Sequence, residues 1–471
     1  MQWKSRALAV GLSAAVWWSP GWHHDLADPA DRPARAAAVA TFMAVAWLTE
    51  AWPMAWVAAV PLFAWPLLGI FPEDGLARAA WPYVDAYVAM FLGGMVLGAA
   101  MEACGLHRRV ALGVMDTVGG TPRRVLAGIL LATAGVSMWI SNTATAVMML
   151  PIALAVVVKL EALAARALPA FAAALLLAVA YGSNVGGIGT KIGTGTNSIL
   201  VGYLSSAMGT EMTFLSYLAI GLPFVLLLLP VVFWALWRHA RADAEHIPSA
   251  GVLIAAERRS LGAMSRSEVV VAVAFALGAL GWITADFTRP WWAEAAPGPW
   301  SGAALKTKHV EAGVGLALAA GLTLVGRAGV AEWRGLPWST LVLLGGSFSM
   351  AAGIEGSGLG VRLATLASGL GDAPLLAQTT AAAAFGVGLS AVASNTATVN
   401  VLLPVLPQTV PVATTLAMAA SCDFALPAGT PPNAIVVGSG RVPVPVMMRV
   451  GVALDIAAVA LAAVFGAVWI A

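Results

Sequence analysis

The sequence predicts an all-α membrane protein that crosses the bilayer many times. Apolar residues make up 60% of the 471 residues and charged residues only 10%, whereas soluble proteins carry about 25% charged residues. The mean hydropathy is +0.85, and apolar runs of the ~20 residues that a membrane-spanning helix needs recur along the whole chain. The alternating segments of about ten residues that are typical of a β-barrel are not visible in the sequence.

Most of the apolar segments have the length of one membrane span, but two are too long. These two, 122–158 and 374–408, are each interrupted by a polar cluster. We expect each to enter the membrane, turn at the cluster and leave on the same side, as a re-entrant hairpin surrounded by protein or by a water-filled cavity. The eleven complete spans are expected at 5–20, 36–51, 53–70, 83–104, 170–200, 214–237, 268–286, 310–326, 337–355, 411–437 and 444–470.

The polar cluster of each hairpin is the same pentapeptide. Ser-Asn-Thr-Ala-Thr begins at Ser141 and again at Ser394, both copies run into Leu-Pro, and a further hydroxyl precedes each copy, at Ser137 and Ser390. Polar side chains inside a membrane are costly unless they are paired or bind something. One such cluster would be explained by helix packing, for which small hydroxyl residues are often used, but two matched clusters indicate a binding site.

The repeat extends beyond the two clusters. Glu102 and Glu355, which follow FLGG and LLGG, are separated by the same offset as the clusters, and each hairpin precedes a helix that Gly or Pro interrupts. Such breaks free backbone carbonyl groups, which suit a hard cation, and helix N-termini, which suit an anion. Because an odd number of crossings separates the halves, the second copy should be inverted. Inverted repeats with broken helices are typical of secondary transporters.

The positions of the basic residues predict the orientation. With the N-terminus, which carries Lys4 and Arg6, on the cytoplasmic side, most Lys and Arg residues of the loops also fall inside, as the positive-inside rule requires. Residues 238–267 are then a polar cytoplasmic linker and 287–308 an outer loop. We therefore expect a multi-pass protein of the cell (inner) membrane with a cytoplasmic N-terminus.

Composition argues against several other classes of site. Cys104 and Cys422 both lie in or beside apolar segments, so neither a disulfide framework nor a metal cluster is expected. The net charge is +2, and no basic stripe with interleaved aromatic residues is present, so no nucleic-acid partner is expected. An intramembrane enzyme would need a nucleophile with a base, or metal ligands, at membrane depth, and the expected spans offer neither.

The segments SMWISNTATAVMMLPIA, SNTATVNVLLPV and SCDFALPAGTPPNAIV resemble those of the divalent anion/sodium symporter family. That family includes sodium-coupled dicarboxylate and citrate transporters and cation-independent dicarboxylate exchangers. The resemblance covers the chain from about residue 36 to the C-terminus. It implies an eleven-helix protomer with two re-entrant hairpins that works as a homodimer, in which a transport domain slides like an elevator along a scaffold domain.

This resemblance divides the chain into four parts. Scaffold helices occupy 1–82, and 83–213 form the transport part of the first repeat, with its hairpin at 122–158 and its broken helix at 170–200. Residues 214–336 return to the scaffold and include the linker 238–267. Residues 337–471 form the second repeat, with the hairpin 374–408, the broken helix 411–437 and the last helix.

The resemblance also implies a site at the two hairpin tips, in a lipid bilayer, for a small carboxylate anion and sodium. The substrate-binding residues implied are Ser141, Asn142, Thr143, Ser394, Asn395, Thr396, Thr196 and Pro432. The implied sodium ligands are Ser137, Ser141, Asn142 and Gly189 in the first half, and Ser390, Ala393, Asn395 and Thr430 in the second. Hydroxyls, amides and helix N-termini hold a carboxylate without a fixed counter-charge, so bound sodium would offset the charge of the dianion.

Two residues depart from the family pattern. Lys191 stands where the family usually has an apolar residue, and Asp423 where it usually has a small one. Both lie in the broken helices near the implied cation sites, so we treat them as modifiers of coupling-ion binding. The ammonium of Lys191 could stand in for sodium or pair structurally with a backbone carbonyl. The carboxylate of Asp423 could strengthen cation binding or carry a proton.

The expected function is secondary active transport of small di- or tricarboxylates, of the succinate, malate, fumarate and citrate class, with sodium symport. Two alternatives stay open at this point: a cation-independent dicarboxylate exchanger, which Lys191 motivates, and a transporter of another divalent anion such as sulfate. A channel is disfavoured because occluding hairpins in an inverted repeat are typical of alternating access.

Overall fold

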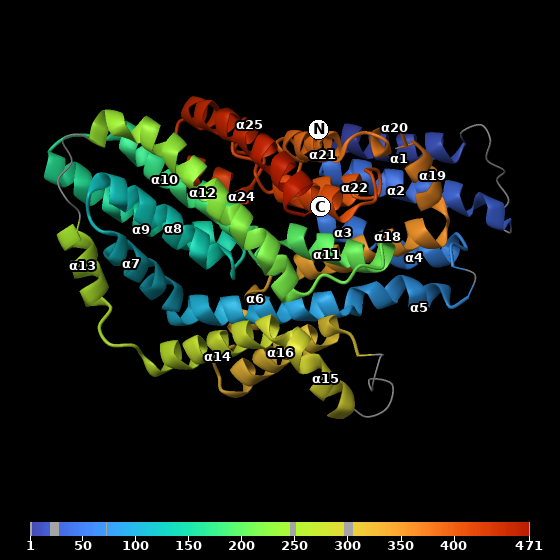
Figure 1. Ribbon diagram of the computed structural model, residues 1–471, viewed down its shortest axis with the longest axis horizontal. Helices are drawn as coiled ribbons and strands as arrows, with labels where there is room; N and C mark the ends of the chain where they lie inside the picture. Colours follow the sequence, from blue (N-terminus) through green and yellow to red (C-terminus); the bar gives the residue numbers. More distant parts are fainter. Residues whose placement is uncertain are drawn as a thin grey trace.

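The computed structural model describes residues 2–18, 28–71, 73–244, 251–295, 305–366 and 368–470, and this part of the chain consists of helices without a β-strand (Figure 1). The prediction of an all-α protein is therefore confirmed. The helices pack around three main buried hydrophobic clusters. One belongs to the N-terminal helices, one lies between the two repeats, and one surrounds the helices of the two hairpins.

The N-terminal helices pack against α18 (Trp338–Gly356). Trp65 is buried there, and its indole N–H donates to the carbonyl oxygen of Ser349 over 2.8 Å. The segment 53–70, expected as one span, is divided at Ala59, because Pro61 has no N–H with which to continue the preceding helix. The group comprises α1 (Gln2–Trp17), η1 (Pro29–Asp31), α2 (Arg32–Leu48), α3 (Met54–Ala58), α4 (Val60–Leu67), α5 (Gly75–Ala80) and η2 (Trp81–Val84).

The first repeat turns and breaks where the sequence predicts. The chain turns at the polar cluster between α8 and α9, and the helix expected over 170–200 is divided between α10 and α11. The polar linker expected at 238–267 is largely helical within the described residues, because α12 continues to Ala244 and α13 follows it. The elements are α6 (Ala86–Cys104), α7 (Leu106–Val118), α8 (Pro122–Ser137), α9 (Asn142–Ala164), α10 (Pro169–Gly187), α11 (Gly195–Ala207), α12 (Phe214–Ala244) and α13 (Gly251–Ser260).

The second repeat follows the same plan with a shorter return helix. Pro151 lies inside α9, which continues to Ala164, whereas α22 ends one residue before Leu403-Pro404. A second proline, Pro407, follows in the second copy, so the helix cannot resume there. The remaining elements are α14 (Arg266–Ile283), α15 (Ala285–Ala295), α16 (Thr307–Leu324), α17 (Val330–Gly335), α18, α19 (Leu359–Leu366), α20 (Ser368–Gly371), α21 (Leu375–Ser390), α22 (Asn395–Leu402), α23 (Val410–Ala420), α24 (Pro431–Gly438) and α25 (Val444–Val468).

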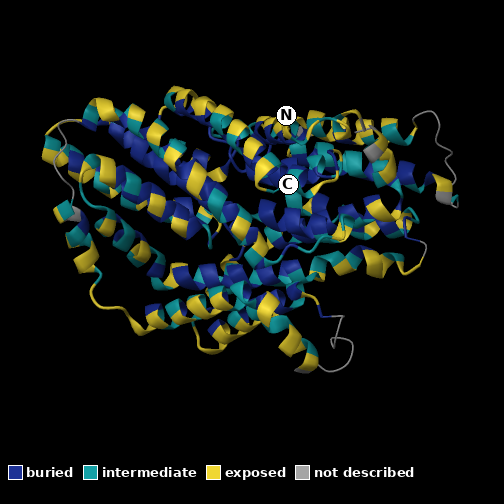
Figure 2. Cartoon of the chain, in the orientation of Figure 1, coloured by how far each residue is buried: buried dark blue, intermediate teal, exposed yellow. Residues whose placement is uncertain are grey.

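Helix α10 is the centre of the hairpin cluster. It is buried along nearly its whole length and packs on α8, α9, α12 and α24, as the dark helix in Figure 2 shows. Helix α12, which we expected among the scaffold helices, packs instead on α8, α10 and α25. Helix α15 occupies part of the expected outer loop 287–308, of which residues 296–304 lie outside the described part.

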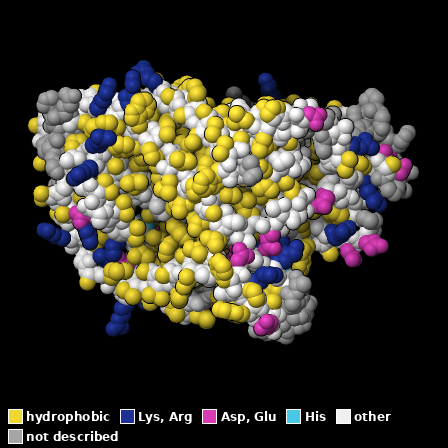
Figure 3. All heavy atoms as spheres, viewed as in Figure 1, with side chains coloured by type: hydrophobic (Ala, Val, Ile, Leu, Met, Phe, Trp, Pro, Cys, Tyr) yellow, Lys and Arg dark blue, Asp and Glu magenta, His cyan; other side chains and the backbone are white. Residues whose placement is uncertain are grey.

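The surface supports a membrane location. Apolar side chains cover the middle of the face in Figure 3, and Lys and Arg side chains gather toward its ends. Within the described residues six helical segments are long and apolar enough to cross a membrane, so the eleven expected spans are not all uninterrupted helices of spanning length. The six are Gly75–Cys104, Asn142–Ala164, Pro169–Gly187, Phe214–Ala244, Arg266–Ile283 and Val444–Val468.

Candidate functional site

Each Ser-Asn-Thr cluster forms the N-terminus of a helix. Ser141 is the N-cap of α9, and its hydroxyl accepts a hydrogen bond from the N–H of Ala144. Ser394 does the same for α22 with the N–H of Ala397. Serine is a favoured N-cap because its oxygen satisfies an otherwise free N–H. The two motifs therefore begin helices, and the residues after the cap expose their N–H groups at the positive ends of the helix dipoles.

Behind each tip, three oxygen atoms converge in the same arrangement. The Ser137 hydroxyl donates to the carbonyl oxygen of Ser183 over 2.7 Å and lies 3.0 Å from Oδ1 of Asn142. In the second half, the Ser390 hydroxyl donates to the carbonyl oxygen of Ala420 over 2.7 Å and lies 2.6 Å from Oδ1 of Asn395. Hydroxyl, amide and carbonyl oxygens are the ligands that hard cations prefer. These two oxygen clusters are thus chemically suited to sodium.

The two broken helices are held by matching asparagines. The Nδ2 of Asn197 donates to the carbonyl oxygens of Gly187 and Thr190, ten and seven residues earlier, over 2.8 and 2.7 Å. The Nδ2 of Asn433 makes the same pair of bonds to residues ten and seven positions earlier in the second break, over 3.2 and 3.0 Å. Each asparagine fixes backbone that has left the helical pattern, and this keeps the break rigid at membrane depth.

A cavity of about 520 Å³ lies between the two hairpin tips and the two broken helices. Asn142 and Asn395 both line it, so the structure brings together the two motifs that lie 253 residues apart in the sequence. All eight residues expected to bind substrate line this cavity: Ser141, Asn142, Thr143, Thr196, Ser394, Asn395, Thr396 and Pro432.

The electrostatic potential of the cavity favours an anion, although no basic side chain is found among the described residues that line it. The N-termini of four helices, α9, α11, α22 and α24, lie at its wall through their caps and first residues, and each carries about half a positive charge. Among the described residues that line it there is no Lys, Arg or His, and the charged residues present are Glu50 and Glu102. An anion bound there is therefore stabilised by helix dipoles, hydroxyls and amides, and needs accompanying cations for charge balance.

Most of the expected cation ligands lie at or near the two oxygen clusters, but the carbonyl oxygen of Gly189 points away from them. Ser137 and Ser390 are fully buried beneath the cavity, and Ala393 is buried in the turn before α22, whereas Thr430 reaches the cavity as the N-cap of α24. The carbonyl oxygen of Gly189 lies against Gly221 on α12. The contact with Asn142 comes instead from Gly187, where a Cβ would overlap the Asn142 amide.

Lys191 does not reach the first tip with its ammonium. The side chain is fully buried, and its Nζ lies 2.6 Å from Oε2 of Glu311 on α16 and donates to the carbonyl oxygen of Met212 over 2.7 Å. A role in place of sodium would require this ammonium to face the first oxygen cluster. In the structure its charge is instead neutralised by a carboxylate 120 residues away in sequence.

Asp423 is buried in the second break without a basic partner among the described residues. Neither of its carboxylate oxygens completes a hydrogen bond there, although the backbone of Ala425 and Leu426 and the carboxylate of Asp455 on α25 are close. A Cβ on Gly429, which lines the cavity, would overlap the Asp423 carboxylate. The carboxylate therefore lies directly behind the cavity wall.

Sequence reasoning missed three residues of this region. Asn184 lines the cavity from α10 and donates to Oγ1 of Thr430 over 3.0 Å. Its signal was a polar pair, Ser183-Asn184, within an apolar helix. Glu311 and Asp455 were also missed, although each is an acid inside an expected span, and an intramembrane acid is seldom placed without a partner or a function.

A second cavity, of about 270 Å³, lies between α7, α9 and α13 and contains none of the expected substrate residues. Glu257 on α13 lies there, 2.5 Å from Arg108 and 3.4 Å from Lys159. Although partial burial opposes its ionisation, the hydrogen bonds and charges of Lys159 and Arg108 hold the pKa of Glu257 below its usual value. These surface ion pairs fasten α13 to α7 and α9.

The chain is similar to known transporters over nearly its whole length. The family profile described as the sodium:sulfate symporter transmembrane region matches residues 6–471. The chain is 35% identical over 437 residues to the sodium-dependent dicarboxylate transporter SdcS of Staphylococcus saprophyticus, an alignment that covers 88% of this chain and 82% of that protein. It is 32% identical over 433 residues to SdcS of Staphylococcus aureus strain USA300, with 88% and 81% covered.

The fold is also similar to a solved structure. The chain matches the YdaH transporter of Alcanivorax borkumensis, known from a crystal structure with an unusual topology, with a TM-score of 0.54 and 15% identity, over 100% of this chain and 97% of that one. At this identity the likeness concerns the fold alone. The profile match and the identity to SdcS concern nearly the whole chain, and they show that it belongs to the sodium:sulfate symporter family of membrane transporters and is not an enzyme.

Proposed function

We propose that the protein is a secondary active transporter that moves small dicarboxylates, of the succinate, malate and fumarate class, together with sodium. The observation that carries the proposal is the cavity itself, which offers four helix N-termini and two Ser-Asn-Thr clusters to an anion but no basic side chain among its described lining residues. The similarity to SdcS, a sodium-dependent dicarboxylate transporter, supports the same substrate and the same ion.

The geometry explains why anion and cation would bind together. Asn142 and Asn395 each line the cavity and also place Oδ1 beside a buried serine hydroxyl that donates to a backbone carbonyl. A sodium ion at each oxygen cluster would lie directly behind a tip that holds a substrate carboxylate. Each ion then stabilises the other through the shared asparagine, so that the two binding free energies are coupled.

We further propose an elevator movement in a homodimer. The packing supports a moving unit of α8–α12 and α21–α25 against a scaffold of α1–α6 and α14–α19. Compared with the division expected from the sequence, α12 joins the moving unit, and α6, α18 and α19 join the scaffold. The cavity follows α6 from Phe91 to Glu102 and reaches the first turn of α18. On the orientation that the basic residues favour, those ends face the cytoplasm. The conformation is therefore assigned as inward-facing, with the N-terminus cytoplasmic.

Uptake of labelled succinate into proteoliposomes tests the function. With an inward sodium gradient we expect saturable uptake that falls to background when choline replaces sodium, and that excess unlabelled malate or fumarate suppresses. Counterflow without sodium at an undiminished rate would support the exchanger instead. Suppression by sulfate but not by dicarboxylates would support transport of an inorganic anion.

Asp423→Asn is expected to weaken sodium binding without preventing folding. The carboxylate adds a negative charge behind the cavity wall at Gly429, and its removal should raise the sodium concentration for half-maximal uptake by about tenfold, equivalent to one charge-assisted contact. The measurement is a sodium titration of succinate uptake. Asp372→Asn, an exposed acid before α21, is the matched control, and an unchanged sodium titration in the Asp423 variant would contradict the assignment.

A further inference from the structure

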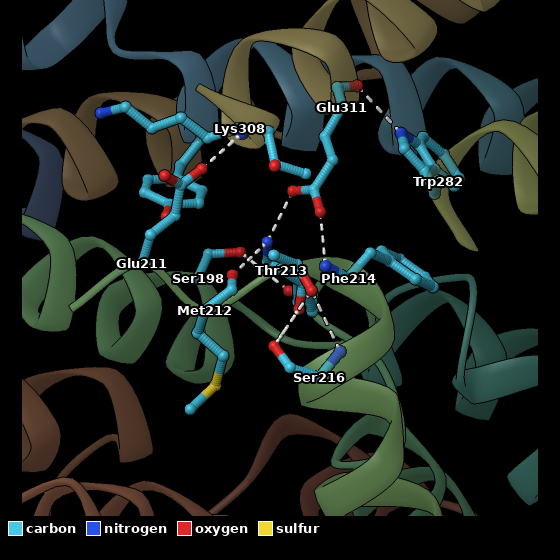
Figure 4. A network of polar contacts seen from close by, with 12 residues as sticks. Ser198, Glu211, Met212, Thr213, Phe214, Ser216, Trp282, Lys308 and Glu311 are labelled. Carbon is cyan, nitrogen blue, oxygen red and sulfur yellow. Dashed lines mark hydrogen bonds and ion pairs between the residues drawn. The ribbon is translucent and has the colours of Figure 1, made fainter. Parts of the chain in front are cut away.

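The ion pair between Lys191 and Glu311 lies on the far side of the site from the cavity opening. Both side chains are fully buried. The second carboxylate oxygen of Glu311 accepts from the N–H of Phe214 at the start of α12, and its backbone carbonyl accepts from the indole of Trp282 over 3.0 Å. Figure 4 shows Glu311 directed from α16 toward Met212 and Phe214. One carboxylate thus joins α16 to the first break and to the start of α12.

The ion pair is not needed to shape the break that carries Lys191. The break is already held from within its own repeat, by Asn197 through two carbonyl groups and by the Ser198 hydroxyl, which donates to the Lys191 carbonyl oxygen over 3.0 Å. The contact with Glu311 differs from these bonds, because it joins the first repeat to α16, which lies outside that repeat. What the pair adds is a connection between two groups of helices.

Glu311 belongs to a closely packed pair of helices, α6 and α16. A Cβ on Gly93 would overlap the backbone of Gly315, so the two helices touch backbone to backbone, and they run side by side in Figure 1. A second ion pair, Lys308 with Asp85 at 2.9 Å, joins the same two helices at their N-terminal ends. Glu311, the partner of Lys191, therefore lies on a helix that is held firmly within the scaffold.

The position of the pair along α6 is opposite to that of the cavity opening. The cavity lies along α6 from Phe91 to Glu102, whereas Lys191 lies 5.0 Å from the ring centre of Tyr87 in the first turn of that helix. The network around Glu311 consequently fills the space between the site and the N-terminal ends of α6 and α16. In the orientation assigned above, this is the outer side.

We propose that Lys191 and Glu311 form a lock that keeps the outer side of the site closed, and that the pair separates each time the site turns outward. This proposal rests on the proposed alternating-access function. Separating a buried ion pair leaves two uncompensated charges unless water reaches them, so the lock both favours the inward-facing state and adds to the barrier for leaving it. A neutral pair of similar shape fills the same space without that barrier.

The test compares two double variants in sodium-driven succinate uptake. Lys191→Met with Glu311→Gln removes both charges and keeps an amide oxygen for the Phe214 N–H. We expect its maximal rate to rise by about fivefold or more, because the movement no longer separates a buried pair. The succinate KM and the sodium half-saturation concentration should stay within about twofold of wild type, because the first break keeps its own hydrogen bonds.

The matched control is Lys308→Met with Asp85→Asn. It removes the neighbouring ion pair within α6 and α16 while retaining an N-cap for α6. Because those two helices move together in the proposal, its maximal rate should equal that of wild type. An equal rise in both double variants would overturn the lock, since any loss of charge near Tyr87 would then suffice.

A labelling measurement reports the opening itself. Met212→Cys places a thiol next to the ion pair at a buried position and keeps the backbone carbonyl that accepts from Lys191, in a background with Cys104→Ser and with the buried Cys422 retained. An impermeant maleimide added outside should label it at least about fivefold faster when Lys191 and Glu311 are both neutralised, because the outward-open population rises. If the thiol is labelled equally fast with and without the charged pair, and the maximal rate is unchanged, the lock is overturned. The transport function would still stand if the wild-type protein takes up succinate with sodium.

The single variant Glu311→Gln provides a check on folding. Glu311→Gln alone leaves a buried ammonium without its counter-charge, which typically destabilises a protein strongly, so we expect poor yield or a lowered melting temperature. The double variant should recover the wild-type melting temperature. If the double variant melts as low as the single one, the pair serves the stability of the fold and the lock is refuted.

Discussion

Asn142→Ala and Asn395→Ala are each expected to lower sodium-driven succinate uptake by roughly 100-fold, because each removes contacts to a charged ligand that are worth ~1.5–3 kcal/mol apiece. Each asparagine lines the cavity and also completes an oxygen cluster with a buried serine. Both the anion and the nearby cation therefore lose a partner. The double variant should show no uptake above that of empty liposomes.

Asn400→Ala is the control for this prediction. Asn400 is buried on the same helix as Asn395 but does not line the cavity, so its loss should leave the succinate KM and the sodium dependence unchanged. Succinate-dependent thermal stabilisation in sodium buffer supplies a second measurement for all three variants. Retained stabilisation in the variant that lacks both cavity asparagines would contradict the whole site.

Gly187→Ala is expected to reduce uptake to below about a tenth of wild type, because overpacking a tight site costs ~1–3 kcal/mol and displaces the neighbouring group. A Cβ at this position would overlap the side-chain amide of Asn142. The added methyl group forces the asparagine away from the first oxygen cluster, so sodium affinity should fall more than protein stability. A sodium titration of uptake, with a melting curve of the same preparation, separates these two effects.

Two glycines that line the cavity serve as matched controls. A Cβ on Gly195 would lie 3.7 Å from Cγ2 of Thr340, and one on Gly98 would lie 3.6 Å from Cγ1 of Ile140, both ordinary contacts. Gly195→Ala and Gly98→Ala should therefore transport within about twofold of wild type, as expected for a methyl group that fits. If Gly187→Ala transports as well as they do, the close approach of Gly187 and Asn142 has no functional role.

Much of the fold follows from local composition. Long apolar runs with few charges indicate a membrane, and dense clusters of Gly and Pro inside them favour breaks, so the segments around Ser141, Ser394 and the two broken helices were predictable. The N-cap role of the serines was the structural reason for those turns. The identical Leu-Pro dipeptides show the limit of local reasoning, because Pro151 lies inside α9 while α22 ends before Pro404. Residues further along the chain decide between the two outcomes.

The parts of the candidate site that belong to the repeated motifs could be predicted from the sequence. The parts outside those motifs could not. The paired motifs and the family resemblance predicted eight substrate-binding residues, and all eight line one cavity in the structure. Asn184 has no counterpart motif, and the direction of the Gly189 carbonyl is a property of the tertiary packing. The unit to which α12 belongs likewise depends on its packing against α10 and α25, which its apolar composition does not encode.

The sequence by itself determined that this protein lies in a membrane and that two polar tips interrupt its apolar segments. The repetition of the tips, with the family resemblance, predicted a site for a small anion. Only the tertiary structure decided that the buried ammonium of Lys191 is neutralised by Glu311 rather than directed at a tip, and that Asp423 has no such partner among the described residues. The physical reason is that sequence reveals which groups are costly to bury, since this depends on residue type. Which group compensates each of them depends on distances between elements far apart in the chain.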